Sequence, residues 1–128
     1  MDYKILIVDD IVINRILLAE LIKKLGYKYV QAANGKEAIE KVEMDQIDLI
    51  LMDIEMPVMN GIETTKYIRE KLTLPKSKMP IVALTAHNPD DFFDTFEKAG
   101  FDDLITKPYL LDKISKTVAK ALGTDHDA

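Results

Sequence analysis

The chain has 128 residues, of which 48% are apolar, and its 17 basic and 22 acidic side chains give a net charge of −5. This length suits one domain with a single hydrophobic core, and the lack of cysteine excludes thiolate catalysis, cysteine-bound zinc and disulfide bonds. No apolar run approaches about 18 residues, residues 1–8 lack the features of a signal peptide and basic residues are not clustered, so we expect a cytoplasmic protein with no membrane segment and no direct nucleic-acid binding.

Five short apolar runs alternate with five longer amphipathic stretches, without linkers or repeats between them. The apolar runs are residues 5–8, 27–32, 49–52, 81–84 and 101–105. Several of them are apolar at consecutive positions, which is typical of parallel strands that helices cover on both faces. The alternation therefore predicts an α/β fold of the (βα)5 type, a doubly wound, parallel five-stranded sheet with right-handed crossovers.

Capping residues mark the ends of the predicted helices. Asn34 with Glu37, and Asn60 with Glu63, have the spacing of a capping box, in which an N-cap side chain and a carboxylate three residues later bond each other's backbone. Residues 88–91 indicate an N-cap, a first-turn proline and an acidic first turn for the fourth helix. Glycines follow the first, fourth and fifth predicted helices, at Gly26, Gly100 and Gly123, where a helix commonly ends.

Reactive side chains follow four of the five predicted strands. Asp9 and Asp10 follow the first strand, Asp53 the third, Thr85 the fourth and Lys107 the fifth. In open parallel sheets, ligands bind outside the carboxyl ends of the strands. We therefore expect the flavodoxin-like strand order 2-1-3-4-5, in which these four positions converge on one pocket and the second strand is an excluded edge.

The three carboxylates of this pocket need a compensating cation. Two carboxylates about 5 Å apart repel each other by about 3 kcal/mol at an effective dielectric constant near 20. Oxygen ligands without histidine or cysteine favour a hard divalent ion, and a few carboxylates with water suit Mg²⁺. Lys107 adds a second positive charge, of a kind that binds phosphoryl oxygens. The combination predicts Mg²⁺-dependent phosphoryl transfer.

The acidic pair, Asp53, Thr85 and Lys107, together with the stretch MDIEMPVMNG at 52–61, resemble the receiver domain of two-component response regulators. The resemblance covers residues 3–122 and is strongest to receivers of hybrid sensor histidine kinases and to stand-alone regulators. We expect a receiver domain over 1–123 and a flexible tail over 124–128. We expect no output domain after residue 123, so the chain is expected to be either a stand-alone regulator or a receiver cut from a larger protein.

The resemblance implies a role for each acidic residue. Asp53 is expected to accept a phosphoryl group from a phosphohistidine, carried by a sensor histidine kinase or a histidine phosphotransfer protein. Asp10 is expected to ligate Mg²⁺ directly, Asp9 to hold it largely through water, and the backbone carbonyl of Glu55 to be a third protein ligand. The family's phosphotransfer is self-catalysed, with slow autodephosphorylation, so the chain is not expected to be a conventional enzyme.

The resemblance also implies how the modification is read by a downstream effector. Lys107 is expected to pair with the phosphoryl oxygens, Thr85 to turn and hydrogen-bond them, and the output surface to be the fourth helix, fifth strand and fifth helix. Many relatives have an aromatic residue where this chain has Leu104, so the coupling of Thr85 to an aromatic ring is expected to differ here. His87 is expected to flank the phosphoryl group, and the bond before Pro108 to be cis.

Two other functions fit parts of the pattern. A Mg²⁺-dependent phosphatase with an aspartyl-phosphate intermediate also uses an α/β sheet, but such enzymes favour a second aspartate two residues after the nucleophile, where this chain has Glu55. A pseudo-receiver, which binds partners without being phosphorylated, does not need the complete acidic set. Both alternatives are less consistent with the pattern than a phosphorylated signalling module.

Overall fold

All five strands are parallel and lie in the order β2-β1-β3-β4-β5. A computed structural model describes residues 2–86 and 97–123. The strands are β1 (Lys4–Val8), β2 (Lys28–Ala32), β3 (Leu49–Asp53), β4 (Ile81–Thr85) and β5 (Asp103–Thr106). The helices are α1 (Val12–Lys24), α2 (Gly35–Met44), α3 (Gly61–Lys71) and α5 (Leu111–Leu122), with a short 3-10 helix η1 (Lys76–Lys78). The predicted doubly wound α/β sheet and its strand order are confirmed.

The predicted strands differ from the observed ones only at their ends. Asp53 and Thr85 are the last residues of β3 and β4 rather than the first residues after them. The fifth strand starts at Asp103 and not at residue 101, since its pairing with β4 begins at Asp103; Phe101 precedes it and is buried in the core. Residues 88–91 and the tail 124–128, for which we predicted a helix start and flexibility, lie outside the described residues.

The predicted helix caps are confirmed where the structure describes them. The Asn60 side chain accepts a hydrogen bond from the Glu63 backbone at 2.8 Å, and the Glu63 carboxylate accepts one from the Asn60 backbone at 3.1 Å. The Asn34 side chain likewise accepts a hydrogen bond from the Glu37 backbone, but the Glu37 carboxylate accepts one from the backbone of Ala33 and not from that of Asn34. Gly123 ends α5 in the left-handed conformation, with φ of 73°. These bonds satisfy backbone groups that helix ends leave unpaired.

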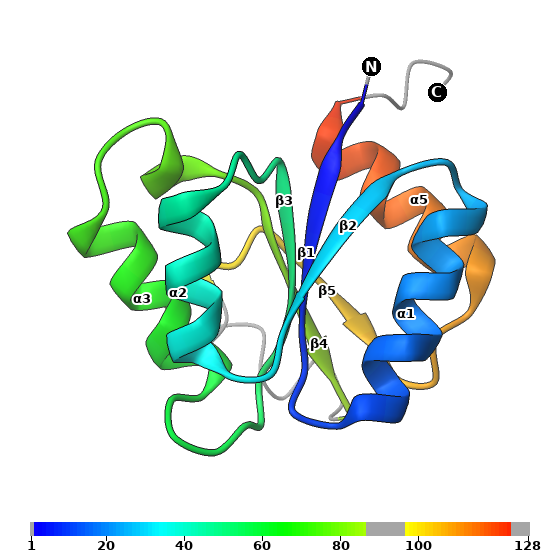
Figure 1. The fold of residues 1–128 in the computed structure, drawn as a ribbon, viewed down its shortest axis with the longest axis horizontal. Helices are drawn as coiled ribbons and strands as arrows, with labels where there is room; N and C mark the ends of the chain where they lie inside the picture. The colour runs from blue at the N-terminus through cyan, green and yellow to red at the C-terminus, as the bar shows by residue number, and fades with distance from the viewer. Residues whose placement is uncertain (1, 87–96, 124–128) are drawn as a thin grey trace.

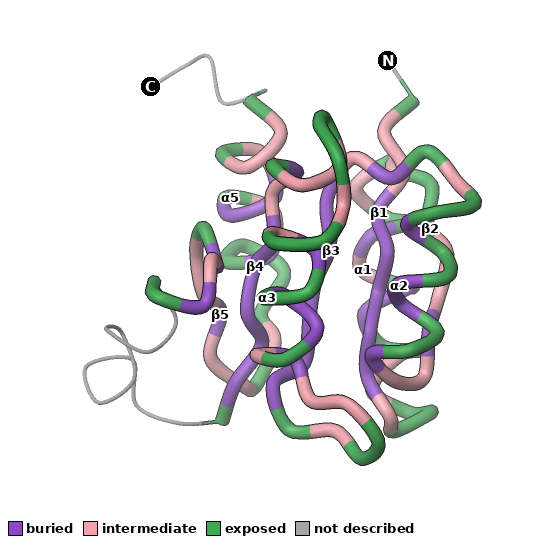
Figure 2. The backbone as a smooth tube through the Cα atoms, turned by 90° about the vertical axis from the view of Figure 1, so that its left-hand side faces the viewer, coloured by how far each residue is buried: buried purple, intermediate pink, exposed green. Residues whose placement is uncertain are grey.

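The core has two halves, one on each face of the sheet. Helices α1 and α5 cover one face and α2 and α3 the other (Figure 1). Side chains alternate along each strand, so Ile5 and Ile7 pack toward α1 and α5, whereas Leu6 and Val8 pack on the other face. The central strands are buried along their length (Figure 2). This arrangement leaves the carboxyl edge of β1, β3, β4 and β5 to carry polar side chains.

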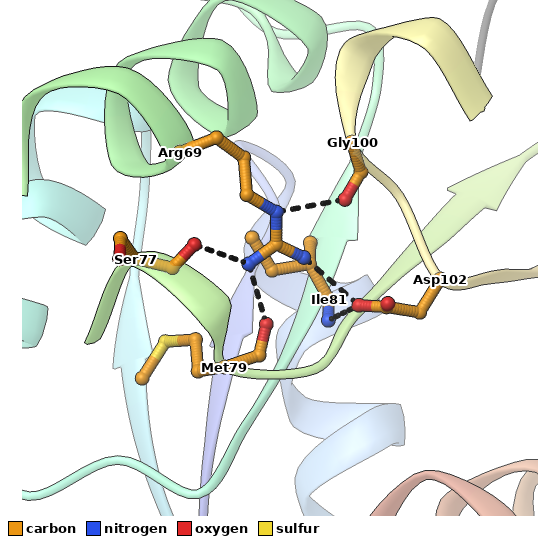
Figure 3. Close-up of polar contacts among 6 residues, drawn as sticks. All are labelled: Arg69, Ser77, Met79, Ile81, Gly100 and Asp102. Carbon is orange, nitrogen blue, oxygen red and sulfur yellow. Dashed lines mark hydrogen bonds and ion pairs between the residues drawn. The ribbon is translucent and has the colours of Figure 1, made fainter. Parts of the chain in front are cut away.

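Arg69 of α3 joins the two segments that precede β4 and β5, at the opposite edge of the sheet (Figure 3). Its guanidinium donates hydrogen bonds to the backbone carbonyls of Gly100, Ser77 and Met79 at 2.9, 3.1 and 2.7 Å. It also pairs with the Asp102 carboxylate at 2.9 Å, and the same carboxylate oxygen accepts a bond from the Ile81 backbone at 2.8 Å. One side chain thus fixes the segments that lead into β4 and β5.

Two adjacent threonines of α3 provide a matched stability test. The buried Thr65 hydroxyl has no hydrogen-bond partner among the described residues, whereas the Thr64 hydroxyl donates to the Asn60 carbonyl at 2.8 Å. Thr65→Val replaces an unsatisfied hydroxyl by a methyl group and is expected to raise the free energy of unfolding by about 1 kcal/mol. Thr64→Val is expected to lower it by about the same amount. Urea denaturation of both variants checks the pair, and a destabilised Thr65→Val contradicts the prediction.

Candidate functional site

Three carboxylates meet where β1 and β3 end. One ligand oxygen from each of Asp9, Asp10 and Asp53 lies within 4.8 Å of the other two. β1 and β3 are neighbours in the sheet, and Val8 of β1 pairs with Met52 of β3. The next residues along the chain, Asp9 and Asp53, therefore lie at the same edge. Asp9 and Asp53 are buried, and Asp10 is more exposed. At this separation each pair of ionised carboxylates repels by about 3 kcal/mol.

Asp9 has one satisfied and one unsatisfied carboxylate oxygen. Its Oδ1 accepts a hydrogen bond from the Ile11 backbone at 2.9 Å. Its Oδ2 is buried and has no hydrogen-bond partner among residues 2–86 and 97–123. A buried carboxylate oxygen without a donor is costly unless a cation or water binds it. This oxygen and its two neighbouring carboxylates fit a hard divalent cation such as Mg²⁺.

The Asp53 carboxylate is destabilised in its charged form. Burial, the charge of Asp9 and, to a smaller extent, that of Asp10 raise the pKa of Asp53 to about 6, against the opposing effects of Lys107 and of a backbone hydrogen bond from Glu55. The Asp53 side chain is 4% exposed, so water screens these charges little. A bound cation next to it favours the ionised carboxylate.

Lys107 and Thr85 complete the predicted set at this edge. The Lys107 Nζ atom lies 3.6 Å from Asp53 Oδ1, and its side chain is 28% exposed. The Lys107 backbone donates a hydrogen bond to the Thr85 carbonyl at 2.8 Å, which joins the ends of β4 and β5. The Lys107–Pro108 peptide bond is cis, as expected. The structure therefore brings Asp9, Asp10, Asp53, Thr85 and Lys107 to one edge.

The sequence matches the family described as the response regulator receiver domain over residues 5–119. The chain belongs to this family. It is 36% identical over 122 residues to sporulation initiation phosphotransferase F of Bacillus subtilis, and the match covers 95% of both chains. It is 38% identical over 116 residues to the CAI-1 autoinducer sensor kinase/phosphatase of Vibrio cholerae, covering 91% of this chain. The receiver spans only 17% of the length of that kinase.

Solved structures agree with this assignment. The receiver domain of a sensor histidine kinase from Pseudomonas aeruginosa, solved with a magnesium ion coordinated in the active site cleft, has a TM-score of 0.86 and 28% identity and covers 96% of this chain and 99% of its own. The chemotaxis protein CheY4 of Vibrio cholerae has a TM-score of 0.87 and 29% identity and covers 95% of this chain and 100% of its own. Receivers are signalling domains and not classical enzymes, which disfavours the phosphatase interpretation.

Several expectations for individual residues remain predictions. The backbone N–H of Glu55 bonds the Asp53 carboxylate, whereas the ligand role of the Glu55 carbonyl stays untested. Leu104 is partly buried and packs against the half of the core that faces α2 and α3. His87 lies outside the described residues. No helix in the described part of the receiver is long and apolar enough to cross a membrane, and the cytoplasmic location stays a prediction.

Three residues at this edge have no clear signal in the sequence. Arg15 of α1 donates hydrogen bonds to the Asp9 carbonyl at 2.7 Å and to the Gln31 side chain at 3.2 Å. A Cβ atom at Gly61 would lie 2.3 Å from the Asp53 carbonyl oxygen, so only glycine lets α3 begin against the end of β3. The third is Tyr109, which follows the cis proline and has a buried hydroxyl. Only the place of Gly61 in the stretch 52–61 could have drawn attention to one of them.

Proposed function

We propose that Asp53 is the phosphoryl acceptor of this receiver, in a Mg²⁺-dependent reaction with the phosphohistidine of a sensor histidine kinase or a histidine phosphotransfer protein. The observation that carries the proposal is the position of Asp53. Its carboxylate is buried among two other carboxylates within 4.8 Å and lies 3.6 Å from the Lys107 ammonium group. A nucleophile, a divalent-cation site and a fixed cation for the product charge are thus in contact at one edge.

The chemistry follows from these groups. An Asp53 carboxylate oxygen attacks phosphorus, the P–N bond of the phosphohistidine breaks, and the imidazole nitrogen leaves with the electron pair. The product is an acyl phosphate, whose added negative charge Lys107 neutralises. Asp9, Asp10, Asp53 and the Glu55 carbonyl would hold a Mg²⁺ ion, which would supply charge neutralisation for the transferred group. Attack of water on phosphorus breaks the P–O bond to Asp53, releases inorganic phosphate and returns the carboxylate, which gives slow autodephosphorylation.

Phosphorylation biases the receiver through new hydrogen bonds. The phosphoryl group presents three strong acceptor oxygens, and Thr85 stands at the end of the neighbouring strand. Hydrogen bonds to charged groups contribute about 1.5 to 3 kcal/mol each, so Thr85 and one backbone donor supply about 3 to 6 kcal/mol. A nearly complete two-state shift needs about 5.5 kcal/mol. The change is read by an effector at the surface formed by the fourth helix, β5 and α5.

Labelling with a small acyl phosphate tests the proposal. Wild type incubated with acetyl phosphate and Mg²⁺ is expected to gain one phosphoryl group by intact mass. Asp53→Asn is expected to gain none, because the amide is not a nucleophile of comparable strength. Asp112→Asn, at an exposed carboxylate in the first turn of α5, is the matched control and is expected to be labelled as wild type. An adduct on Asp53→Asn would refute the assignment of the acceptor. No adduct on wild type would refute it as well and would favour the pseudo-receiver alternative.

Exposed apolar side chains beside the acceptor support docking of a protein donor. Helix α1 begins two residues after Asp10 and α5 begins four residues after Lys107, so both helix starts border the site. The exposed apolar residues there are Ile11, Val12, Ile13, Ile16, Leu17, Leu110 and Leu111. A surface of this kind, next to the reacting carboxylate, suits a partner that must bring its phosphohistidine to Asp53.

A protein donor and a small donor separate docking from chemistry. The exposed fraction of Ile13 is 72%, and Ile13→Ser removes this apolar side chain from the surface beside the acceptor. Transfer from a histidine phosphotransfer protein that phosphorylates wild type is expected to slow at least about tenfold, since about 1.4 kcal/mol of lost contact suffices. Labelling by acetyl phosphate is expected to be unchanged. Met44→Ser, at an 85% exposed residue at the far end of α2, should change neither rate. Equal slowing with both donors contradicts the docking role.

A further inference from the structure

Two buried polar atoms at the acceptor site have no hydrogen-bond partner in the described part of the chain. They are the Tyr109 hydroxyl and Asp9 Oδ2. An unpaired buried group of this kind destabilises the folded state unless water or a ligand satisfies it. A phenol hydroxyl can donate one hydrogen bond, and a carboxylate oxygen can only accept. The two atoms are therefore a buried donor and a buried acceptor that need complementary partners.

The alternation of side chains places both residues on the same side of the sheet. Ile5 and Ile7 of β1, and Leu49 and Leu51 of β3, belong to the half of the core that faces α1 and α5. Asp9 and Asp53 continue these two rows, since side chains two residues apart along a strand point to the same face. Tyr109 packs against the same half of the core. Its ring thus lies on the side of the sheet to which Asp9 and Asp53 project.

Electrostatics agree with this placement. Burial, and then the negative charges of Asp9 and Asp53, raise the pKa of the Tyr109 hydroxyl well above its usual range. At neutral pH the hydroxyl keeps its proton and is available as a hydrogen-bond donor near two acceptors.

We propose that Tyr109 is a positioning residue of the acidic site, whose hydroxyl donates through one ordered water to the Asp9 carboxylate and holds it in the orientation that binds the divalent cation. The other contacts of Asp9 leave this part of the carboxylate unsupported. Ile11 donates to Oδ1 and Arg15 to the backbone carbonyl, so Tyr109 supplies the restraint on Oδ2. Partners that orient metal ligands commonly change metal affinity by about 10- to 100-fold. The inference rests on the proposed function, because it requires that Asp9 bind a cation.

Titration with Mg²⁺ alone tests this inference. Tyr109→Phe keeps the ring and removes the hydroxyl, and is expected to bind Mg²⁺ about tenfold more weakly than wild type. Tyr27→Phe is the matched control, because Tyr27 packs against the same half of the core but precedes β2 at the other end of the sheet. Its affinity is expected to equal that of wild type. Calorimetry gives the affinities, and urea unfolding verifies that both variants fold.

Tyrosine absorbance gives a second readout that a packing role would not change. Mg²⁺ is expected to perturb the near-ultraviolet tyrosine spectrum of wild type and Tyr27→Phe, and to lose this effect in Tyr109→Phe. Equal Mg²⁺ affinity for wild type and Tyr109→Phe overturns the inference, and so does a Mg²⁺-induced spectral change in Tyr109→Phe as large as that of wild type. Either result leaves the acceptor assignment intact. Failure of wild type itself to bind Mg²⁺ overturns the proposed function and this inference together.

Discussion

Asp53→Asn is expected to raise the free energy of unfolding of the metal-free receiver at pH 7 by about 2 to 3 kcal/mol. The pKa of Asp53 is raised from 3.8 to about 6, and each unit of difference between the folded and unfolded states corresponds to about 1.4 kcal/mol. Wild type therefore holds a proton more tightly when folded, and its stability falls as pH rises from about 4 through 6. Asparagine has similar size and no charge, so the variant lacks this loss.

Urea unfolding in EDTA at pH 4.5 and pH 7.5 measures the effect. The stability difference between Asp53→Asn and wild type should be small at the lower pH and close to its full value at the higher one. Mg²⁺ should then reduce the stability difference between Asp53→Asn and wild type, because wild type is expected to bind the ion more tightly. A ligand at ten times its dissociation constant stabilises the folded state by about 1.4 kcal/mol. A difference that is independent of pH would mean that the Asp53 carboxylate is not destabilised as described.

Arg69→Ala is expected to lower the free energy of unfolding by about 3 to 5 kcal/mol. The substitution removes three hydrogen bonds to backbone carbonyls and leaves the Asp102 carboxylate without its cation. The Arg69 side chain is 19% exposed, so water replaces only part of these contacts. The segments before β4 and β5 should loosen first, because they are what the guanidinium joins.

Urea denaturation compares this variant with Lys66→Ala, which removes an exposed cation from the same helix and should change stability by less than about 0.5 kcal/mol. Arg69→Lys is expected to lie between the two, since an ammonium group cannot reproduce the planar geometry of a guanidinium. Hydrogen exchange should show the largest loss of protection around Ile81. Equal stability of Arg69→Ala and Lys66→Ala would refute the structural role of Arg69.

Most of the fold and of the acidic site could be predicted from the periodicity of apolar residues and from the position of polar residues at the ends of strands. The alternating apolar runs predicted the parallel sheet, and the order 2-1-3-4-5 was expected because it brings the reactive strand ends together. The candidate site residues could be placed because each lies at or just after the end of a strand; they are Asp9, Asp10, Asp53, Thr85 and Lys107. Such residues depend on local sequence and on the rule that parallel strands end at one edge. The capping pair Asn60 and Glu63 was predictable for the same reason, because its geometry lies within one helical turn.

Residues that act across the fold could not be predicted in this way. Arg69 bonds residues that lie up to 33 positions away in sequence, and Tyr109 joins the half of the core that faces α1 and α5 only when the whole sheet is assembled. Neither has a periodic or local signal that separates it from an ordinary helix arginine or core tyrosine. The close approach of Gly61 to Asp53 is similar, since the clash that a side chain would cause exists only when α3 is packed on β3.

The alternation of side chains also places Asp53 and Thr85 on opposite faces of the sheet. Asp9, Asp53 and Tyr109 lie on the side of α1 and α5, whereas Ala83 of β4 and its register partner Leu104 belong to the other half of the core, and Thr85 continues the row of Ala83. A structural change that starts at Asp53 must therefore extend around the carboxyl edge of the sheet to reach that half of the core. We therefore expect Thr85, when it binds a phosphoryl group on Asp53, to transmit the change from the half of the core that contains Leu51 to the half that contains Ala83 and Leu104.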